Sequence, residues 1–157
     1  MKYVLLLRGI NVGGNNRIEM ARLRLLLEKL GYTNVVTYIN SGNVIFDSKS
    51  VPDVNIIKQS IKNEFGFDVP TLVLAGEDIV RIAEAIPAEW GNDYTHQKSD
   101  VLYLFSEANT PKVLDIIEGK PEIETFIYID GAVLTNISRK YQSKGSLQKI
   151  VGTKLYK

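Results

Sequence analysis

The chain of 157 residues is 45% hydrophobic and 24% charged, which is typical of an ordinary globular protein. At this length about 68–70% of the unfolded surface is buried on folding, enough for one substantial core or two smaller halves. The absence of cysteine excludes disulfides, thiolate nucleophiles and cysteine-ligated metals, and it fits a reducing cytoplasm. No apolar run approaches the roughly 20 residues that cross a bilayer, and no signal-peptide pattern is present, so we expect a cytoplasmic protein without a membrane partner.

The formal net charge of +1 conceals an uneven distribution along the chain. Residues 1–31 carry six basic and two acidic side chains, and residues 138–157 carry six basic and none acidic. The intervening residues 32–137 hold seven basic and sixteen acidic side chains. If the two ends of the chain meet in space, they form a positive face that attracts phosphate or nucleic acid. The alternative is that the lysines only solvate exposed helices.

The first elements are a short strand, a polar loop and a helix. The apolar run at residues 3–7 predicts a strand buried on both faces at the centre of a sheet. A loop rich in glycine and asparagine follows at residues 8–17, and a helix opens near Ile18. Asn16, with Glu19 three residues later, predicts a capping box at the start of that helix. The stripe facing the core should consist of Leu23, Leu26, Leu27 and Leu30.

A hairpin, a second helix and a fourth strand come next. Two β-rich runs within residues 34–46 are separated by Asn40-Ser41-Gly42-Asn43, which predicts a hairpin turning at these four residues. Pro52-Asp53 opens a helix that Gly66 ends, and residues 71–75 form the last strand of this half. The order strand, helix, strand, strand, helix, strand is the split β-α-β or ferredoxin-like pattern.

The rest of the chain resembles the first half in a shortened form. Residues 76–99 are predicted as a linking helix, stopped by Pro87, and a polar loop. The predicted elements of the second half are a strand at 100–105, a helix with Thr110 as N-cap and its end at Gly119, a hairpin at 126–134 and a closing helix at 143–151.

A tandem duplication accounts for this resemblance. Tyr38-Ile39-Asn40 and Tyr128-Ile129-Asp130 are similar and occupy corresponding places in the two predicted hairpins. We therefore predict an α+β fold of two similar ferredoxin-like halves, residues 1–75 and 100–157. Their sheets should be mixed or antiparallel with helices packed on one face, and the halves should form one compact unit.

The loop at residues 8–17 is the best candidate for a site. A strand, glycines and a helix start together can present unpaired backbone N–H groups to an anion. In a ferredoxin-like unit the first strand ends at the edge where the hairpin turns, so residues 40–43 should lie beside this loop. The candidate ligand-binding residues are Arg8, Asn11, Gly13, Gly14, Asn15, Asn16, Arg17, Asn40, Ser41, Gly42 and Asn43, with Arg139 and Lys144 from the basic C-terminal segment.

Such a group of hydrogen-bond donors suits the binding of an anion or a polar ring better than the breaking of a bond. The alternative is that the glycines and asparagines only form a tight turn and a helix cap. Gly9 to Gly14 lack the lysine of a P-loop and the spacing of a dinucleotide-binding fold. Ser41 lacks a nucleophile elbow, and the single histidine, His96, and the scattered acids give no metal-ligand pattern. We assign no catalytic residue and no cofactor.

Several motifs resemble the bacterial family called domain of unknown function 1697. They are Arg8-Gly9-Ile10-Asn11-Val12-Gly13-Gly14, the helix at 16–30, Thr37-Tyr38-Ile39-Asn40-Ser41-Gly42-Asn43-Val44, and the segment from Ser138-Arg139 to Gly152-Thr153. The resemblance implies an α+β fold with two similar halves and a cytoplasmic bacterial protein, and it implies no particular activity. Members of this family usually continue into a Thr-x-Arg-Asn segment, whereas this chain ends at Leu155-Tyr156-Lys157. Either the chain is truncated or the last element of the second half is missing, and a site that needs that arginine would then be incomplete.

Three functional hypotheses follow. The first is binding of a small molecule or a phosphate-containing ligand at loop 8–17 and turn 40–43, with or without catalysis. The second is nucleic-acid binding by halves that resemble RNA-recognition motifs, although neither half has the glycine-aromatic pattern of such motifs. The third is a scaffold that acts through self-association or a protein partner. The sequence favours no oligomeric state.

Overall fold

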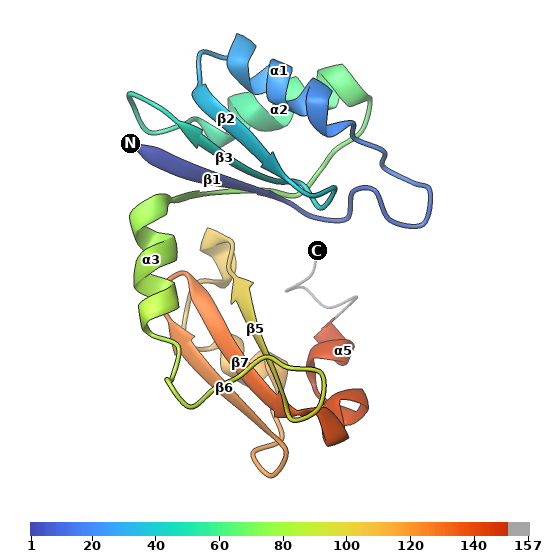
Figure 1. Cartoon of the computed structure of the whole chain (residues 1–157), viewed down its shortest axis with the longest axis vertical. Helices are drawn as coiled ribbons and strands as arrows, with labels where there is room; N and C mark the ends of the chain where they lie inside the picture. Colours follow the sequence, from blue (N-terminus) through green and yellow to red (C-terminus); the bar gives the residue numbers. More distant parts are fainter. Residues whose placement is uncertain (151–157) are drawn as a thin grey trace. The chain divides into compact units, whose positions relative to one another are not determined.

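The computed structural model describes residues 1–150, and these form an α+β fold with two antiparallel sheets (Figure 1). The chain divides into two compact units, Met1–Val80 and a second that begins at Arg81. Within residues 1–150, no helix has the length and apolar character needed to cross a membrane.

The first unit is a four-stranded antiparallel sheet with two helices on one face (Figure 1). Its strands are β1 (Lys2–Leu7), β2 (Thr33–Tyr38), β3 (Asn43–Asp47) and β4 (Thr71–Ala75), in the order β2-β3-β1-β4. Its helices are α1 (Met20–Lys29) and α2 (Val54–Phe65). The predicted strands and the second predicted helix are therefore confirmed to within one or two residues.

The core of this unit lies between the sheet and the two helices. Alternate residues of the central strand β1, Tyr3, Leu5 and Leu7, are buried there, as the two-residue period of a strand requires. Leu23 and Leu27 of α1 are fully buried against them. Full burial of each such side chain stabilises the fold by roughly 1.5–3 kcal/mol.

The opposite face of this sheet is also apolar, but neither helix of this unit covers it. Val4 pairs with Leu74 on one side and Ile45 on the other, and Ile45 pairs with Val36, so four aliphatic side chains form a row across the sheet. Val36 is 59% exposed, and Val4 is only partly buried. The prediction that the first strand is buried on both faces is therefore wrong, because the helices cover only one face.

Helix α2 has the predicted boundaries. The Asp53 side chain accepts hydrogen bonds from the backbone N–H groups of Asn55 and Ile56 at 2.8 and 3.3 Å, so it is the N-cap. Gly66 ends the helix with φ of 88°, the left-handed conformation in which glycine is favoured.

Helix α1 begins differently from the prediction. The N-cap is Glu19, whose side chain makes no capping hydrogen bond, and the predicted capping box of Asn16 and Glu19 does not form. Asn16 instead lies in the left-handed region with φ of 52°, and its amide donates to the Gly9 carbonyl at 3.3 Å. The N–H groups in the first turn of α1 therefore have no side-chain cap.

The second unit is built on a three-stranded antiparallel sheet in the order β5-β7-β6. Its strands are β5 (Gln97–Tyr103), β6 (Glu124–Ile129) and β7 (Ala132–Ser138). Its helical segments are α4 (Val113–Ile117) and α5 (Leu147–Ile150) with the 3-10 turns η1 (Ser106–Ala108) and η2 (Arg139–Lys144), and α3 (Gly76–Glu84) leads into the unit from the first.

Both faces of the second sheet are covered, which differs from the prediction of helices on one face. Ile82 of α3 packs with Leu134 on one face, and Val113 and Ile117 of α4 pack with Val133 on the other. The central strand β7 is consequently buried on both sides, and its first four residues are all buried.

Two predicted helices of this unit are shorter than expected. The predicted N-cap Thr110 lies before a turn, and α4 begins only at Val113 and ends at Ile117, because Glu118 adopts φ of 51°. The predicted closing helix is replaced by η2 and α5, and its predicted end at Val151 lies outside the described residues, as does the end of the second half.

A buried carboxylate joins the last elements of this unit. Glu124, 7% exposed, accepts hydrogen bonds from the Ser146 hydroxyl at 2.5 Å, the Ser146 N–H at 2.9 Å and the Lys120 N–H at 2.9 Å. Burial alone raises the pKa of Glu124, but these hydrogen bonds outweigh it and hold the pKa below the usual 4.5. Since the folded pKa is lowered, this carboxylate stabilises the fold above about pH 4.5, and the stabilisation is lost as the pH falls through the folded value.

Substitution Ser146→Ala should lower the free energy of unfolding by about 1.5–3 kcal/mol at pH 7, because it removes a hydrogen bond to a buried carboxylate. The difference from the unchanged protein should shrink below about pH 4.5, as Glu124 becomes protonated in both. Urea unfolding at several pH values measures this, with the exposed Ser143→Ala as the control. A difference that does not depend on pH would contradict the assigned role of Glu124.

Candidate ligand-binding site

The loop between β1 and α1 is a miniature hairpin (Figure 1). The Asn11 N–H donates to the Asn16 carbonyl at 3.1 Å, and Val12 and Asn15 form an antiparallel bridge. Gly13 and Gly14 connect them with φ of 63° and 80°, and positive φ at both central positions is what a tight type I′ turn requires. A Cβ atom at either position would meet no atom within 4 Å. Glycine is therefore favoured here by the positive φ of the turn, and not by a lack of space for a side chain.

Asn11 holds this hairpin against the rest of the first unit. Its side-chain amide donates to the carbonyls of Ile18 at 3.0 Å and Asn40 at 2.9 Å, and its oxygen accepts from the Ile18 N–H at 2.8 Å. These bonds fix the segment that leads into α1 and tie it to the turn between β2 and β3. Asn11 was predicted as a ligand donor, but both of its amide protons already bind protein carbonyls.

The two loops are neighbours, as the topology predicted. The Leu7 N–H donates to the Gly42 carbonyl at 3.1 Å, and Gly42 has φ of 82°. The same turn holds Ile39 at φ of 46°, an uncommon and strained conformation for a β-branched residue. Ile39 directly precedes Asn40, whose carbonyl accepts the hydrogen bond from the Asn11 amide.

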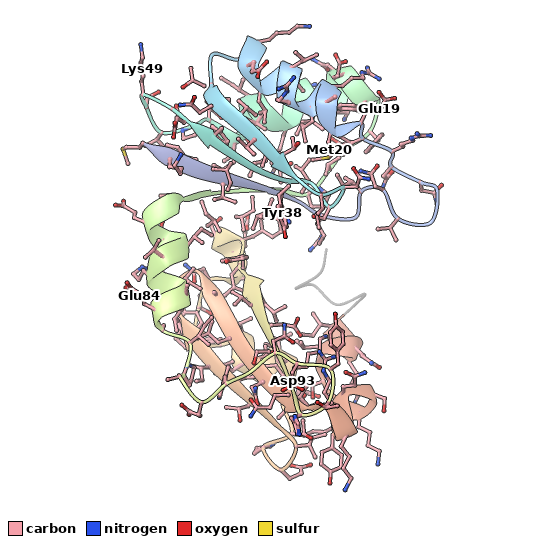
Figure 2. All side chains as sticks on the ribbon, in the orientation of Figure 1. Glu19, Met20, Tyr38, Lys49, Glu84 and Asp93 are labelled. Atoms are coloured by element: carbon pink, nitrogen blue, oxygen red, sulfur yellow. The ribbon has the colours of Figure 1, made fainter. Side chains whose placement is uncertain are left out.

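A hollow of about 600 Å³ opens between these loops and the start of α1. Figure 2 labels Glu19 and Met20, which mark this end of the helix. The residues that line the hollow are Asn11, Gly14, Asn15, Arg17, Ile18, Glu19, Met20, Ala21 and Asn40. The uncapped first turn of α1 therefore forms part of its wall, and the positive end of the helix dipole lies there.

Among the described residues, the lining of the hollow contains one basic side chain, Arg17, and one acidic side chain, Glu19. Arg17 is exposed and has no hydrogen-bond or ion-pair partner among residues 1–150. Arg22 of α1 forms an ion pair with Glu64 at 2.6 Å, so its guanidinium is less available to bind a ligand than that of Arg17. Glu19 supplies the only carboxylate among the lining residues, at the entrance to α1.

Residues 1–134 match the model of a family described as "Protein of unknown function (DUF1697)". The chain belongs to this family. It is also similar to a solved structure described as that of conserved bacterial protein SP0830 from Streptococcus pneumoniae, with 28% sequence identity and a TM-score of 0.77. That similarity covers 99% of this chain and 88% of the other. No curated protein matches the chain.

The hollow of this DUF1697 protein brings together only part of the predicted set, namely Asn11, Gly14, Asn15, Arg17 and Asn40. Ser41 and Asn43 instead bind each other at 2.9 Å, from Asn43 Nδ2 to the Ser41 hydroxyl. Gly13, Asn16 and Gly42 shape the two loops, and Arg8, at the end of β1, donates its backbone N–H to the Pro70 carbonyl. The lining residues that the sequence prediction missed are Ile18, Glu19, Met20 and Ala21.

The two predicted basic residues near the C-terminal end lie in the second unit. The Arg139 guanidinium donates to the Asp93 carbonyl at 2.6 Å, Gln142 Oε1 at 2.9 Å and Asn92 Oδ1 at 3.3 Å. The Lys144 carbonyl accepts from Lys120 Nζ at 2.6 Å. Arg139 therefore has a structural role, because it fastens the loop before β5 to η2.

His96 of the DUF1697 chain has a carboxylate beside it, that of Asp93. Asp93, labelled in Figure 2, lies 3.6 Å from the His96 ring, and its carboxylate also accepts from the backbone N–H groups of His96 and Thr95. These N–H groups lower the pKa of Asp93 to about 2. The histidine side chain is 81% exposed, and the arrangement is a turn closed by an aspartate side chain rather than an enclosed catalytic pair.

Proposed function

We propose that the first unit binds a small phosphate-containing ligand in the hollow at the start of α1. The observation that carries this proposal is the meeting of an uncapped helix N-terminus and an unpaired Arg17 in one hollow of about 600 Å³. Backbone N–H groups and the helix dipole favour an anion at such a place, and a guanidinium adds a charge-assisted hydrogen bond.

Glu19 narrows the class of ligand. A carboxylate at the rim repels a bare phosphate ion but accepts hydrogen bonds from hydroxyl or amino groups. The lining therefore suits a ligand with a phosphate at one end and hydroxyl groups at the other, such as a sugar phosphate or a nucleotide, better than inorganic phosphate. We propose binding rather than catalysis, because the lining places no general base next to an activated nucleophile.

The experiment is a thermal-shift screen of the protein with sugar phosphates, nucleotides, inorganic phosphate and short single-stranded oligonucleotides. A ligand at 100 times its Kd stabilises the folded state by about 2.7 kcal/mol, and each kcal/mol moves the midpoint by roughly 2–4 °C at this chain length. Arg17→Ala should remove the shift without lowering the midpoint of the free protein.

The matched control for this screen is Arg24→Ala, which changes an exposed arginine of α1 that is 3.9 Å from Glu28. The control should keep the full ligand shift. An equal shift in Arg17→Ala, or no shift with any phosphate compound, would contradict the proposal.

Nucleic-acid binding is a second candidate. The strand order β2-β3-β1-β4 with an open sheet face is the arrangement that RNA-recognition motifs use, and Tyr38 on that face is 64% exposed. However, the two central strands present Val4, Leu6 and Ile45 there, which cannot stack on bases as aromatic rings do. If an oligonucleotide gives a shift, its affinity should fall steeply with salt, and a flat response would exclude phosphate-driven binding.

We also propose that both units derive from one ferredoxin-like unit by duplication. The order β5-β7-β6 repeats the order β1-β3-β2 when strands are matched along the chain. The similar triplets lie at the ends of matching strands. Residues 38–40 begin at the last residue of β2, and residues 128–130 begin at the second-last residue of β6. A superposition that fails to bring these triplets together would contradict the duplication.

A further inference from the structure

The second unit contains a hollow of its own, of about 240 Å³. It lies on the face of the sheet that carries α4, beside η2 and α5. The residues that line it are Lys98, Asp100, Glu124, Phe126, Thr135, Asn136, Ile137, Arg139, Gln142, Gly145, Leu147 and Gln148.

Thr135, on the central strand β7, lines the base of this hollow. Its partners in the sheet are Asp100 on β5 and Phe126 on β6, so the three side chains lie in a row with Thr135 in the middle. Thr135 is only 3% exposed, yet its hydroxyl has no hydrogen-bond partner among residues 1–150. A buried hydroxyl ordinarily has a partner, because leaving it without one costs free energy.

Glu124, unlike Thr135, has hydrogen-bond partners within the protein. Glu124 lines the same hollow, but its carboxylate is bonded to Ser146 and Lys120. No side-chain nitrogen or oxygen that is fully buried within the described chain is without a partner. The Thr135 hydroxyl is therefore open to the hollow, where an occupant of the hollow can bind it.

The two walls beside Thr135 differ in chemistry. On the β5 side, Lys98 Nζ lies 3.0 Å from Asp100 Oδ2, with 40% and 37% of the two side chains exposed. On the β6 side, Phe126 provides an apolar surface, and Leu147 of α5 adds to the lining. One wall thus carries a positive and a negative group side by side, and the other is apolar.

These features define a ligand class by size and charge. A volume of 240 Å³ equals that of about eight water molecules at about 30 Å³ each, which is enough for one amino acid. Lys98 and Asp100 are paired with each other, but both side chains are more than a third exposed, and such a pair is weak enough for a ligand to replace it. The ligand's carboxylate then binds Lys98, its ammonium group binds Asp100, and an apolar side chain contacts Phe126. We propose that this hollow binds a small zwitterion of amino-acid size, with a hydrogen bond to the Thr135 hydroxyl. The proposal is independent of the phosphate site, because it uses different residues in a different unit.

The test is calorimetric titration of the full chain with glycine, L-leucine and L-phenylalanine, each compared with its N-acetyl and amide derivatives. The two larger amino acids should bind more tightly than glycine, because only they reach the apolar wall. Loss of either charge in the derivatives should weaken binding by about tenfold or more, as expected for a hydrogen bond between charged groups. No binding of any amino acid up to about 10 mM, a free energy near −2.7 kcal/mol, would overturn the proposal.

Two variants locate the site. Thr135→Val keeps the shape of the side chain and removes the hydroxyl, and it should weaken binding by about 2- to 12-fold. Thr125→Val is the matched control on an exposed position of β6 and should bind as the unchanged protein does. If Thr135→Val does not fold, Asp100→Asn replaces it, since that side chain is partly exposed, and it should reduce the preference for the free amino acid over its N-acetyl derivative. Unchanged binding in the folded variants would overturn the assignment.

Discussion

Gly42→Ala should destabilise the first unit by about 2–5 kcal/mol, because a left-handed backbone disfavours alanine by about 1–2 kcal/mol and overpacking adds about 1–3 kcal/mol. Gly42 has φ of 82°, and a Cβ atom there would lie 2.7 Å from the Leu7 Cβ and 2.8 Å from the Ile10 Cδ1. Both neighbours are buried, so they cannot move aside without disturbing the core.

Gly14→Ala is the matched control for this change. Its φ of 80° imposes nearly the same backbone strain, but a Cβ there meets no atom within 4 Å. It should therefore lower the stability by only about 1–2 kcal/mol. Equal effects of the two substitutions would show that packing between the loops contributes nothing.

The measurement has to report on the first unit. The only tryptophan, Trp90, packs in the second unit, so its fluorescence is not a suitable probe. Urea unfolding followed by far-ultraviolet circular dichroism gives the free energy, and hydrogen exchange of β1 shows where protection is lost.

Asn11→Ala should lower the free energy of unfolding of the same unit by about 4–5 kcal/mol. Three side-chain hydrogen bonds disappear, each with a net contribution of about 1 kcal/mol, and the carbonyl of Asn40 loses its partner. Since Asn11 has φ of 55°, alanine adds a backbone penalty that glycine avoids. Asn11→Gly therefore measures the hydrogen bonds alone and should be the milder of the two.

Asn15→Ala provides the control, because the Asn15 side chain has no hydrogen bond within the described part of the chain. It should change stability by less than about 0.5 kcal/mol. Asn11→Ala should also abolish the ligand shift attributed to the hollow, since the two loops that form it are then no longer joined. A normal ligand shift in a folded Asn11→Ala protein would place the site elsewhere.

The sequence predicts those elements whose signals are local. Asp53 and Gly66 mark the ends of α2 because capping and left-handed termination depend on a few adjacent residues. The neighbourhood of the two loops is also predictable, because it follows from strand order.

The start of α1 is not predictable in this way. The local pattern of Asn16 and Glu19 favours a capping box. In the structure, however, the Asn11 side-chain oxygen accepts a hydrogen bond from the Ile18 N–H, and its amide nitrogen donates to the carbonyl of Asn40, 29 residues away in the chain. That long-range bond keeps the segment before Met20 out of the helix, so the helix N-terminus and its hollow lie where the local pattern did not place them. Likewise, the open hydroxyl of Thr135 depends on which side chains meet across β5, β6 and β7.

The irregular pairing of β2 has a consequence for self-association. This strand lies at the edge of its sheet and carries the exposed Val36 and Tyr38, a combination that normally invites another molecule to add a strand. The register with β3 shifts between Thr33 and Val36, and the left-handed Ile39 ends the strand. A bulge of this kind bends and twists the edge strand. The regularly paired part of β2, residues 36–38, is therefore too short to form a long series of hydrogen bonds with a strand of another molecule. This edge of the first sheet is therefore a poor template for the addition of a strand from another molecule.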